Sequence, residues 1–134
     1  MSRDGMDVVA DIAAPARVVW SILTDTTLWP AWGPSVRAVD APSRFVGLGM
    51  RGRVRTAVGL WVPFSISELE EGRRWAWRVA RMPATGHRVE GLTEATCRAV
   101  FEVPLWAAPY AVVCRVALGR IARIAGGYTA PEPG

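Results

Sequence analysis

The sequence contains no lysine, asparagine or glutamine, and only one histidine and two cysteines among its 134 residues. Two cysteines make no disulfide framework, and Cys97, Cys114 and His87 have no spacing typical of a zinc site. We therefore expect no metal site and no cofactor. Hydrogen bonding inside any pocket has to come from Ser, Thr, Tyr, His, Arg, carboxyl groups or the backbone.

Arginine alone carries the basic excess, and the net charge is a modest +4. The arginines are spread along the chain without a basic block, so we expect no nucleic-acid partner. The longest apolar stretch, 100–119, is interrupted by Glu102, Pro104, Pro109 and Arg115, and residues 1–11 are polar, so we expect no secretory signal. These features predict a cytoplasmic protein that does not span a membrane.

Seven tryptophans stand out in an otherwise ordinary globular composition, half of it apolar. Tryptophan suits walls that must be both flat and apolar. The length predicts one domain, which we place over residues 1–127, followed by a flexible tail over 128–134. We expect a monomer or a homodimer.

Hydrophobic periodicity and turn signals give the expected elements. We expect strands over 6–12, 36–41, 51–58, 61–69, 73–82, 87–92 and 95–103, helices over 16–23 and around 28–29, and a last helix over about 104–125. Residues 83–86 are expected to form a turn, and an odd-length loop such as 59–61 would place Val54 opposite Ile66.

Three stretches resemble the START-like or SRPBCC superfamily, the polyketide cyclase/dehydrase group. They are APARVVWSILTDTTLWPAWGPSV (14–36), FSISELEEGRRWAWRV (64–79) and GHRVEGL (86–92), followed by a strand ending in FEV and a helix. The resemblance implies an α+β helix-grip fold in β-α-α-β6-α order. In that fold a curved antiparallel sheet of six to seven strands wraps around the C-terminal helix. It also implies a pocket between the sheet and the helix, but no particular function.

Strand and helix phase identify the residues expected to line such a pocket. The expected ligand-binding residues are Trp32, Phe64, Trp75, Trp77, Phe101, Val113 and Ala117. In a sheet without a pocket the same aromatic residues would simply be core.

His87, Tyr110 and Arg81 are the candidate catalytic residues. His87 is the side chain that titrates nearest neutral pH, and Tyr110 could pair with it as an acid/base couple. Arg81 points inward if its strand runs that far, where it could hold a carboxylate or enolate oxygen. The alternatives are a histidine satisfied by backbone or water and an arginine that extends to solvent.

Three functions remain open from the sequence. The first is a protein that binds a small hydrophobic or aromatic molecule, polyketide-like or lipid-like, in a closed cavity of a few hundred Å3. The second is a polyketide cyclase/dehydratase-type enzyme that uses His87, Tyr110 and Arg81 for proton transfer. The third is an interaction module with a filled core.

Overall fold

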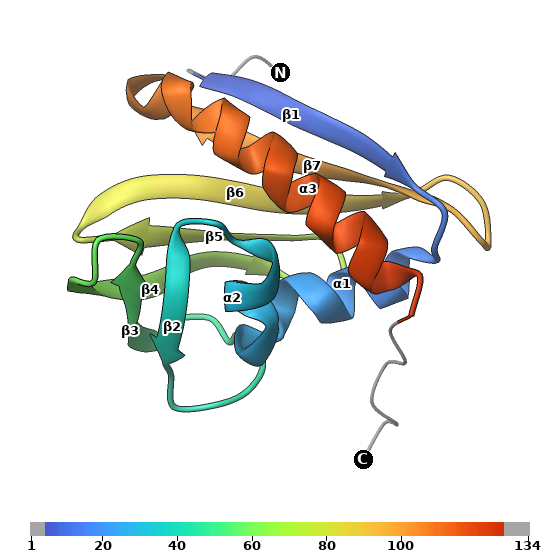
Figure 1. Cartoon of the computed structure of the whole chain (residues 1–134). Coiled ribbons are helices and arrows are strands. Elements are labelled where there is room, and N and C mark those ends of the chain that lie inside the picture. The colour runs from blue at the N-terminus through green and yellow to red at the C-terminus, as the bar shows by residue number, and fades with distance from the viewer. Residues whose placement is uncertain (1–4, 128–134) are drawn as a thin grey trace.

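A computed structural model describes residues 5–127 of the chain (Figure 1). Its strands are β1 (Gly5–Ile12), β2 (Val36–Asp40), β3 (Arg51–Thr56), β4 (Trp61–Glu70), β5 (Arg74–Val79), β6 (Met82–Gly91) and β7 (Cys97–Pro104). Its helices are α1 (Ala16–Thr24), α2 (Trp29–Trp32) and α3 (Ala111–Ala125), with 3-10 turns η1 (Thr26–Leu28) and η2 (Leu105–Tyr110).

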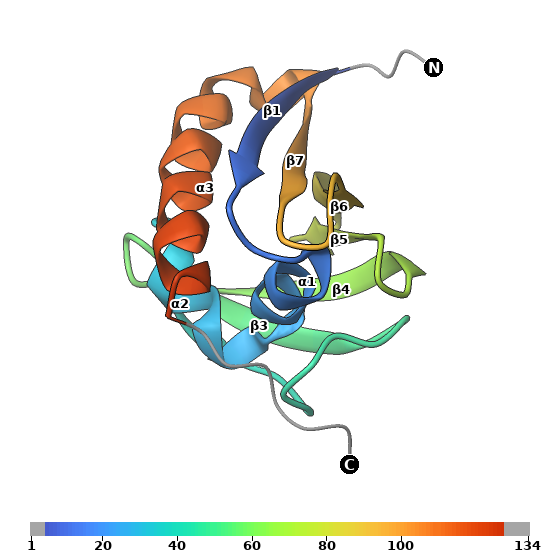
Figure 2. The same cartoon turned by 90° about the vertical axis from the view of Figure 1, so that its right-hand side faces the viewer.

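The seven strands form one antiparallel sheet in the order β1-β7-β6-β5-β4-β3-β2. Strands β2 to β7 follow one another as a meander, and α1, η1 and α2 carry the chain from β1 at one edge to β2 at the other. The sheet curls, and α3 lies on its concave side along β1 and β7 (Figure 2). This is the α+β helix-grip architecture expected from the sequence, so the fold prediction is confirmed. The expected tail at 128–134 lies outside the described residues.

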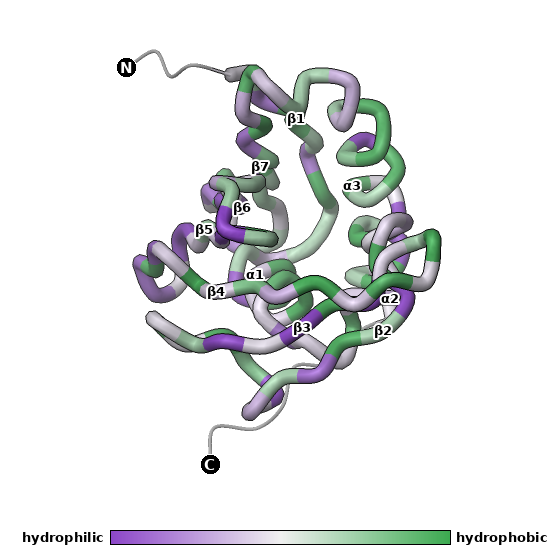
Figure 3. Tube along the Cα trace, turned by 90° about the vertical axis from the view of Figure 1, so that its left-hand side faces the viewer, coloured by the Kyte–Doolittle hydropathy of each residue, from purple (hydrophilic) through white to green (hydrophobic). Residues whose placement is uncertain are grey.

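Alternation along the strands decides which side chains meet α3, and hydropathy alternates along the strands in the same way (Figure 3). The inward faces of β5, β6 and β7 contribute Trp75, Val89 and Phe101 to the core. On α3, Cys114, Ala117, Leu118 and Ile121 are buried at helical spacing.

The helical stretch Leu105–Ala125 is long and apolar enough to cross a membrane by length and composition alone. It is also the core helix of this fold, because its inner face packs on the sheet. Its outer side carries exposed Val112, Arg115 and Val116.

The β5–β6 hairpin differs from the expected one. The chain turns at Ala80 and Arg81, whose φ angles are +51° and +69°, and Val79 pairs with Met82. The prediction of a strand over 73–82 and a turn over 83–86 is therefore wrong, and 82–86 belong to β6. Arg81 leaves the strand phase that would have pointed it inward and is exposed in the turn.

The register of the β3–β4 hairpin also differs. Val54 pairs with Val62, not with Ile66, and Gly52 pairs with Phe64. The number of residues between the last pair, Arg55 and Trp61, is odd, as expected, and Thr56 N–H donates to the Leu60 carbonyl across the turn at 2.8 Å. Gly59 adopts φ +90° there, a conformation that favours glycine.

Candidate functional site

A continuous aromatic cluster fills most of the concavity. Trp29 stacks on Trp75 with ring centroids 5.3 Å apart and meets Phe64 and Trp77 edge-on. Trp75 in turn stacks on His87 at 3.9 Å, and His87 meets Phe101 edge-on at 4.8 Å. Such contacts add to the burial energy of the rings themselves.

Helix α1 ends against this cluster, which fixes the position of α2. The indole N–H of Trp29 donates to the Leu23 carbonyl at 3.0 Å, and that of Trp32 donates to the Ile22 carbonyl at 3.3 Å. Both carbonyls belong to the last turn of a helix, where no intrahelical donor remains. The two tryptophans of the WPAW segment therefore cap α1 while their rings pack in the core.

His87 is buried, with 2% of its surface exposed, and both of its ring nitrogens have partners. Its Nδ1 lies 3.3 Å from the Trp75 carbonyl oxygen, which can only accept, so Nδ1 carries the proton. Its Nε2 then accepts from the Thr85 hydroxyl at 2.9 Å, and that hydroxyl accepts from the Trp77 indole N–H at 3.1 Å. Burial lowers the pKa of His87 to about 3, so the ring is neutral at physiological pH.

The space left between the cluster and α3 is small. An interior cavity of about 20 Å3 lies there, which is room for about one water molecule. Six of the seven expected ligand-binding residues border it, together with His87 and Tyr110; the six are Trp32, Trp75, Trp77, Phe101, Val113 and Ala117. Phe64 does not border it. This cavity is therefore far smaller than the closed cavity of a few hundred Å3 that we expected.

A larger space opens at the end of the concavity, beyond Trp77. This groove has a volume of about 360 Å3 and lies between the β3–β4 hairpin, β5 and β6, and η2. Its walls are mainly apolar; they include Val54, Val58, Val62, Val79, Trp77 and Trp106. Four residues border both the groove and the interior cavity, namely Val36, Trp77, Thr85 and Tyr110.

Four hydroxyl groups are polar exceptions in the groove wall, namely those of Ser35, Thr56, Thr85 and Tyr110. The Tyr110 and Ser35 hydroxyls share a hydrogen bond that joins η2 to the loop after α2. Burial raises the pKa of Tyr110, so this hydroxyl stays protonated at neutral pH. The Thr56 hydroxyl is buried and has no hydrogen-bond partner within residues 5–127.

The three candidate catalytic residues do not converge. His87 and Tyr110 border the interior cavity, each hydrogen-bonded to a different residue. Arg81 lines a separate hollow together with Arg51 and Arg78. Among residues 5–127 no group of three or more His, Cys, Asp or Glu side chains could hold a metal ion. Cys97 and Cys114 are buried free thiols, and burial raises the pKa of both.

Sequence reasoning missed most of the groove residues. Thr56 and Val58 lie at a hairpin end whose register was predicted wrongly, and Trp106 lies in η2, ahead of α3. One signal was present: Trp106 and Leu105 sit between Pro104 and Pro109 and do not belong to the buried face of the helix. Large apolar residues that no core explains are candidates for a binding surface.

Comparison with known proteins places this geometry in context. The family of polyketide cyclase/dehydrase and lipid transport proteins matches residues 5–124. No curated protein matches the chain. The chain is similar to a solution structure from Thermobifida fusca, with TM-score 0.70 and 18% identity over 92% of this chain and 94% of that one.

Two further structures share the fold. One is DynU16 from the dynemicin biosynthetic locus, with TM-score 0.67 and 19% identity over 96% of this chain and 49% of that one. The other is norcoclaurine synthase from Thalictrum flavum in complex with dopamine and hydroxybenzaldehyde. Its TM-score is 0.61, with 10% identity over 94% of this chain and 88% of that one.

Proposed function

Because the chain belongs to the polyketide cyclase/dehydrase and lipid transport family, we propose that it binds a small apolar or aromatic molecule, polyketide-like or lipid-like, in the groove beside Trp77. The groove volume of about 360 Å3 falls in the range of small-molecule sites. A protein of the same fold, norcoclaurine synthase, is known in complex with the aromatic molecules dopamine and hydroxybenzaldehyde.

The observation that carries the proposal is the Thr56 hydroxyl, a buried polar group with no hydrogen-bond partner within residues 5–127, on a residue that borders the mainly apolar groove. An unpaired buried hydroxyl costs about 1–3 kcal/mol, which a ligand with its own hydroxyl or carbonyl group would recover. The ligand is therefore an apolar body with at least one polar group placed to reach Thr56.

Thr56→Val tests this point because valine keeps the shape of threonine and lacks its hydroxyl. We expect the variant to bind 1-naphthol about fivefold more weakly than the wild type, which corresponds to about 1 kcal/mol. Naphthalene, which lacks the hydroxyl, should bind the variant at least as tightly as the wild type. If both compounds bind the two proteins equally, Thr56 has no part in recognition.

The alternative, a cyclase or dehydratase that transfers protons through His87, Tyr110 and Arg81, has less support from the geometry. Arg81 is exposed in the β5–β6 turn, away from the other two. A histidine with a pKa of about 3 is also a weak base at neutral pH. These catalytic roles stay predictions, as do a cytoplasmic location and the absence of nucleic-acid, membrane and cofactor partners.

A further inference from the structure

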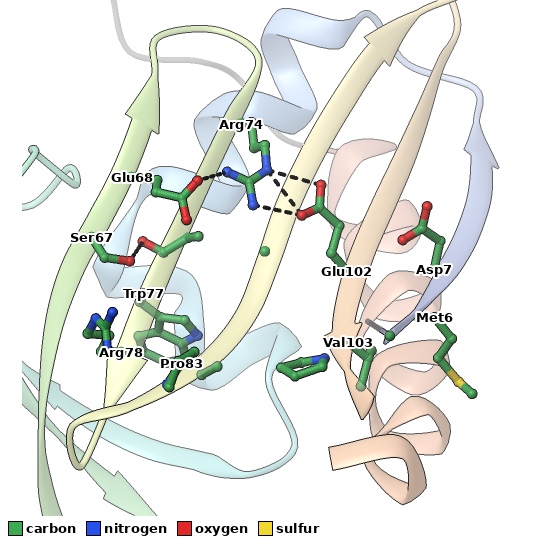
Figure 4. Close-up of a pocket in the computed structure, with 15 residues that line it drawn as sticks. Met6, Asp7, Ser67, Glu68, Arg74, Trp77, Arg78, Pro83, Glu102 and Val103 are labelled. Carbon is green, nitrogen blue, oxygen red and sulfur yellow. Dashed lines mark hydrogen bonds and ion pairs between the residues drawn. The ribbon is translucent and has the colours of Figure 1, made fainter. Parts of the chain in front are cut away.

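Two groups of charged residues on the outer face of the sheet differ in how their arginines are paired. In the first, Glu102 is nearly buried and accepts from Arg74 at 2.7 Å and from Arg88 at 2.7 Å, while Arg74 also donates to Glu68 at 2.6 Å. Figure 4 shows Arg74 between the two carboxylates, with Arg78 lying apart from them. In this first group each guanidinium is therefore matched by carboxylates.

The second group consists of Arg51, Arg78 and Arg81, whose guanidinium groups make no hydrogen bond or ion pair within residues 5–127. All three are exposed. They line one hollow of about 460 Å3 together with Gly52, Pro63, Phe64 and Ser65. That lining contains no carboxylate, and the sequence has no Asp or Glu between positions 41 and 67.

Strand register places two of these arginines in a row. Arg51 on β3 pairs with Ser65 on β4, and Ser65 pairs with Arg78 on β5. Paired residues share a face and lie about 5 Å apart, so the two arginines flank the serine on adjacent strands. Their long side chains can meet above the Ser65 hydroxyl, which has no hydrogen-bond partner among the described residues.

The third arginine, Arg81, lies in a strained turn beside the hollow. A two-residue hairpin with positive φ at both positions normally holds Asn or Gly, but here it holds Ala80 and Arg81. A non-glycine residue in this conformation is strained, and such strain concentrates at functional sites. The turn is held by Ala80 N–H, which donates to the Pro63 carbonyl at 2.8 Å.

We propose that Arg51, Arg78, Arg81 and Ser65 form a binding site for a phosphate monoester group on the outer face of the sheet. Each guanidinium offers five N–H donors in a planar fork, and the serine adds one hydroxyl. Three positive charges exceed what a carboxylate needs and suit a phosphate dianion with three terminal oxygens. The group belongs either to a soluble phosphomonoester or to a lipid headgroup such as phosphatidic acid, and the second source would overturn the expectation of no membrane partner.

This site is independent of the groove, because Arg51, Ser65 and Arg78 alternate along their strands with residues that face the core. The alternative explanation is a solvated arginine face with no specific site. A charge-matched pair of variants separates the two. Arg51→Gln/Arg78→Gln removes two charges from the hollow, and Arg17→Gln/Arg115→Gln removes two exposed charges from α1 and α3.

The test measures affinity for glycerol 3-phosphate by calorimetry, and for phosphatidylcholine vesicles with and without phosphatidic acid by co-sedimentation, at fixed ionic strength. For at least one of the two ligands, we expect the affinity to fall tenfold or more in R51Q/R78Q and twofold or less in R17Q/R115Q. Arg81→Gln should lose at least threefold in the same arm. Binding in the first arm identifies a soluble ester, and binding only in the second identifies a lipid headgroup.

Two results would overturn the proposal. One is the absence of binding by the wild type in both arms. The other is an equal response of the two double variants, whether both lose or both keep binding, because net charge alone would then explain the affinity. Equal melting temperatures of all variants ensure that folding is not the cause.

Discussion

Tyr110 and Ser35 share a hydrogen bond between their hydroxyl groups, which ties the segment before α3 to the loop after α2. The bond spans 75 positions in the sequence, and Tyr110 borders both the groove and the interior cavity. The pair therefore links the start of the C-terminal helix to the loop after α2 at the boundary between the groove and the interior cavity.

This bond should be measurable as a coupling energy. In a double-mutant cycle of Ser35→Ala and Tyr110→Phe we expect the two substitutions to be non-additive by about 0.5–1.5 kcal/mol in the free energy of unfolding. Denaturant unfolding of the four proteins gives the value. Additive effects would mean that the two hydroxyls do not bond in solution.

His87 should remain neutral far below its usual pKa. It is the single histidine of the chain, so its ring signals in an NMR spectrum are unambiguous. Because burial lowers its pKa to about 3, we expect the ring carbon and proton shifts to stay constant from pH 8 to pH 5. A titration midpoint near 6.5 would show that the ring is accessible to water.

The same pKa shift gives a pH dependence of stability. An unfolded histidine takes up a proton below about pH 6.5, whereas native His87 does so only near 3. The stability that comes from keeping His87 neutral is therefore fully present above pH 6.5 and is lost as the pH falls toward 3. Between pH 5.5 and 4, wild type should lose about 1.4 kcal/mol per pH unit more than His87→Phe.

Trp29 and Trp106 form a matched pair for the core. Trp29 is 2% exposed and contacts three aromatic rings, whereas Trp106 is 60% exposed. We expect Trp29→Ala to cost about 3–5 kcal/mol of stability and Trp106→Ala less than about 0.5 kcal/mol. Chemical denaturation measures both, and similar costs would argue against the described packing.

Two glycines should respond in opposite directions to alanine. A Cβ at Gly86 would lie 2.6 Å from Oε1 of Glu102, whereas a Cβ at Gly119 meets nothing within 4 Å. Gly86→Ala should therefore cost about 1–3 kcal/mol, and Gly119→Ala in α3 should stabilise the protein by about 0.5–1 kcal/mol. Thermal unfolding distinguishes the two, and a neutral Gly86→Ala would show that Glu102 moves freely.

The sequence predicted the order of the elements and the inward faces of the strands, because burial imposes alternation that is visible residue by residue. The prediction was wrong at 80–86, because Pro83 and Gly86, which suggested a turn, are present for other reasons. Pro83 lies where β6 extends beyond its pairing with β7, so it occupies a local sheet edge. Gly86 is small because Glu102 and Arg74 cross over it.

The predicted site residues show a different limit. Phase identifies which side chains face inward, but it does not say how much space they leave. Trp29, Trp75 and Trp77 pack on one another and fill the concavity. The remaining space lies at its open end, and part of its wall comes from positions outside the strands, such as Val58 and Trp106.

The central claim is that an apolar ligand binds in the groove, and the indole N–H signals in an NMR spectrum test it most directly. Trp77 and Trp106 line the groove, whereas Trp20 lies on α1, where its indole N–H donates to Glu71 at 3.3 Å. On titration with 1-naphthol and with decanol, we predict saturable shifts of the Trp77 and Trp106 signals by at least one of the two compounds, with Trp20 unchanged. If neither compound moves the Trp77 and Trp106 signals more than that of Trp20, the groove is not a binding site for such molecules.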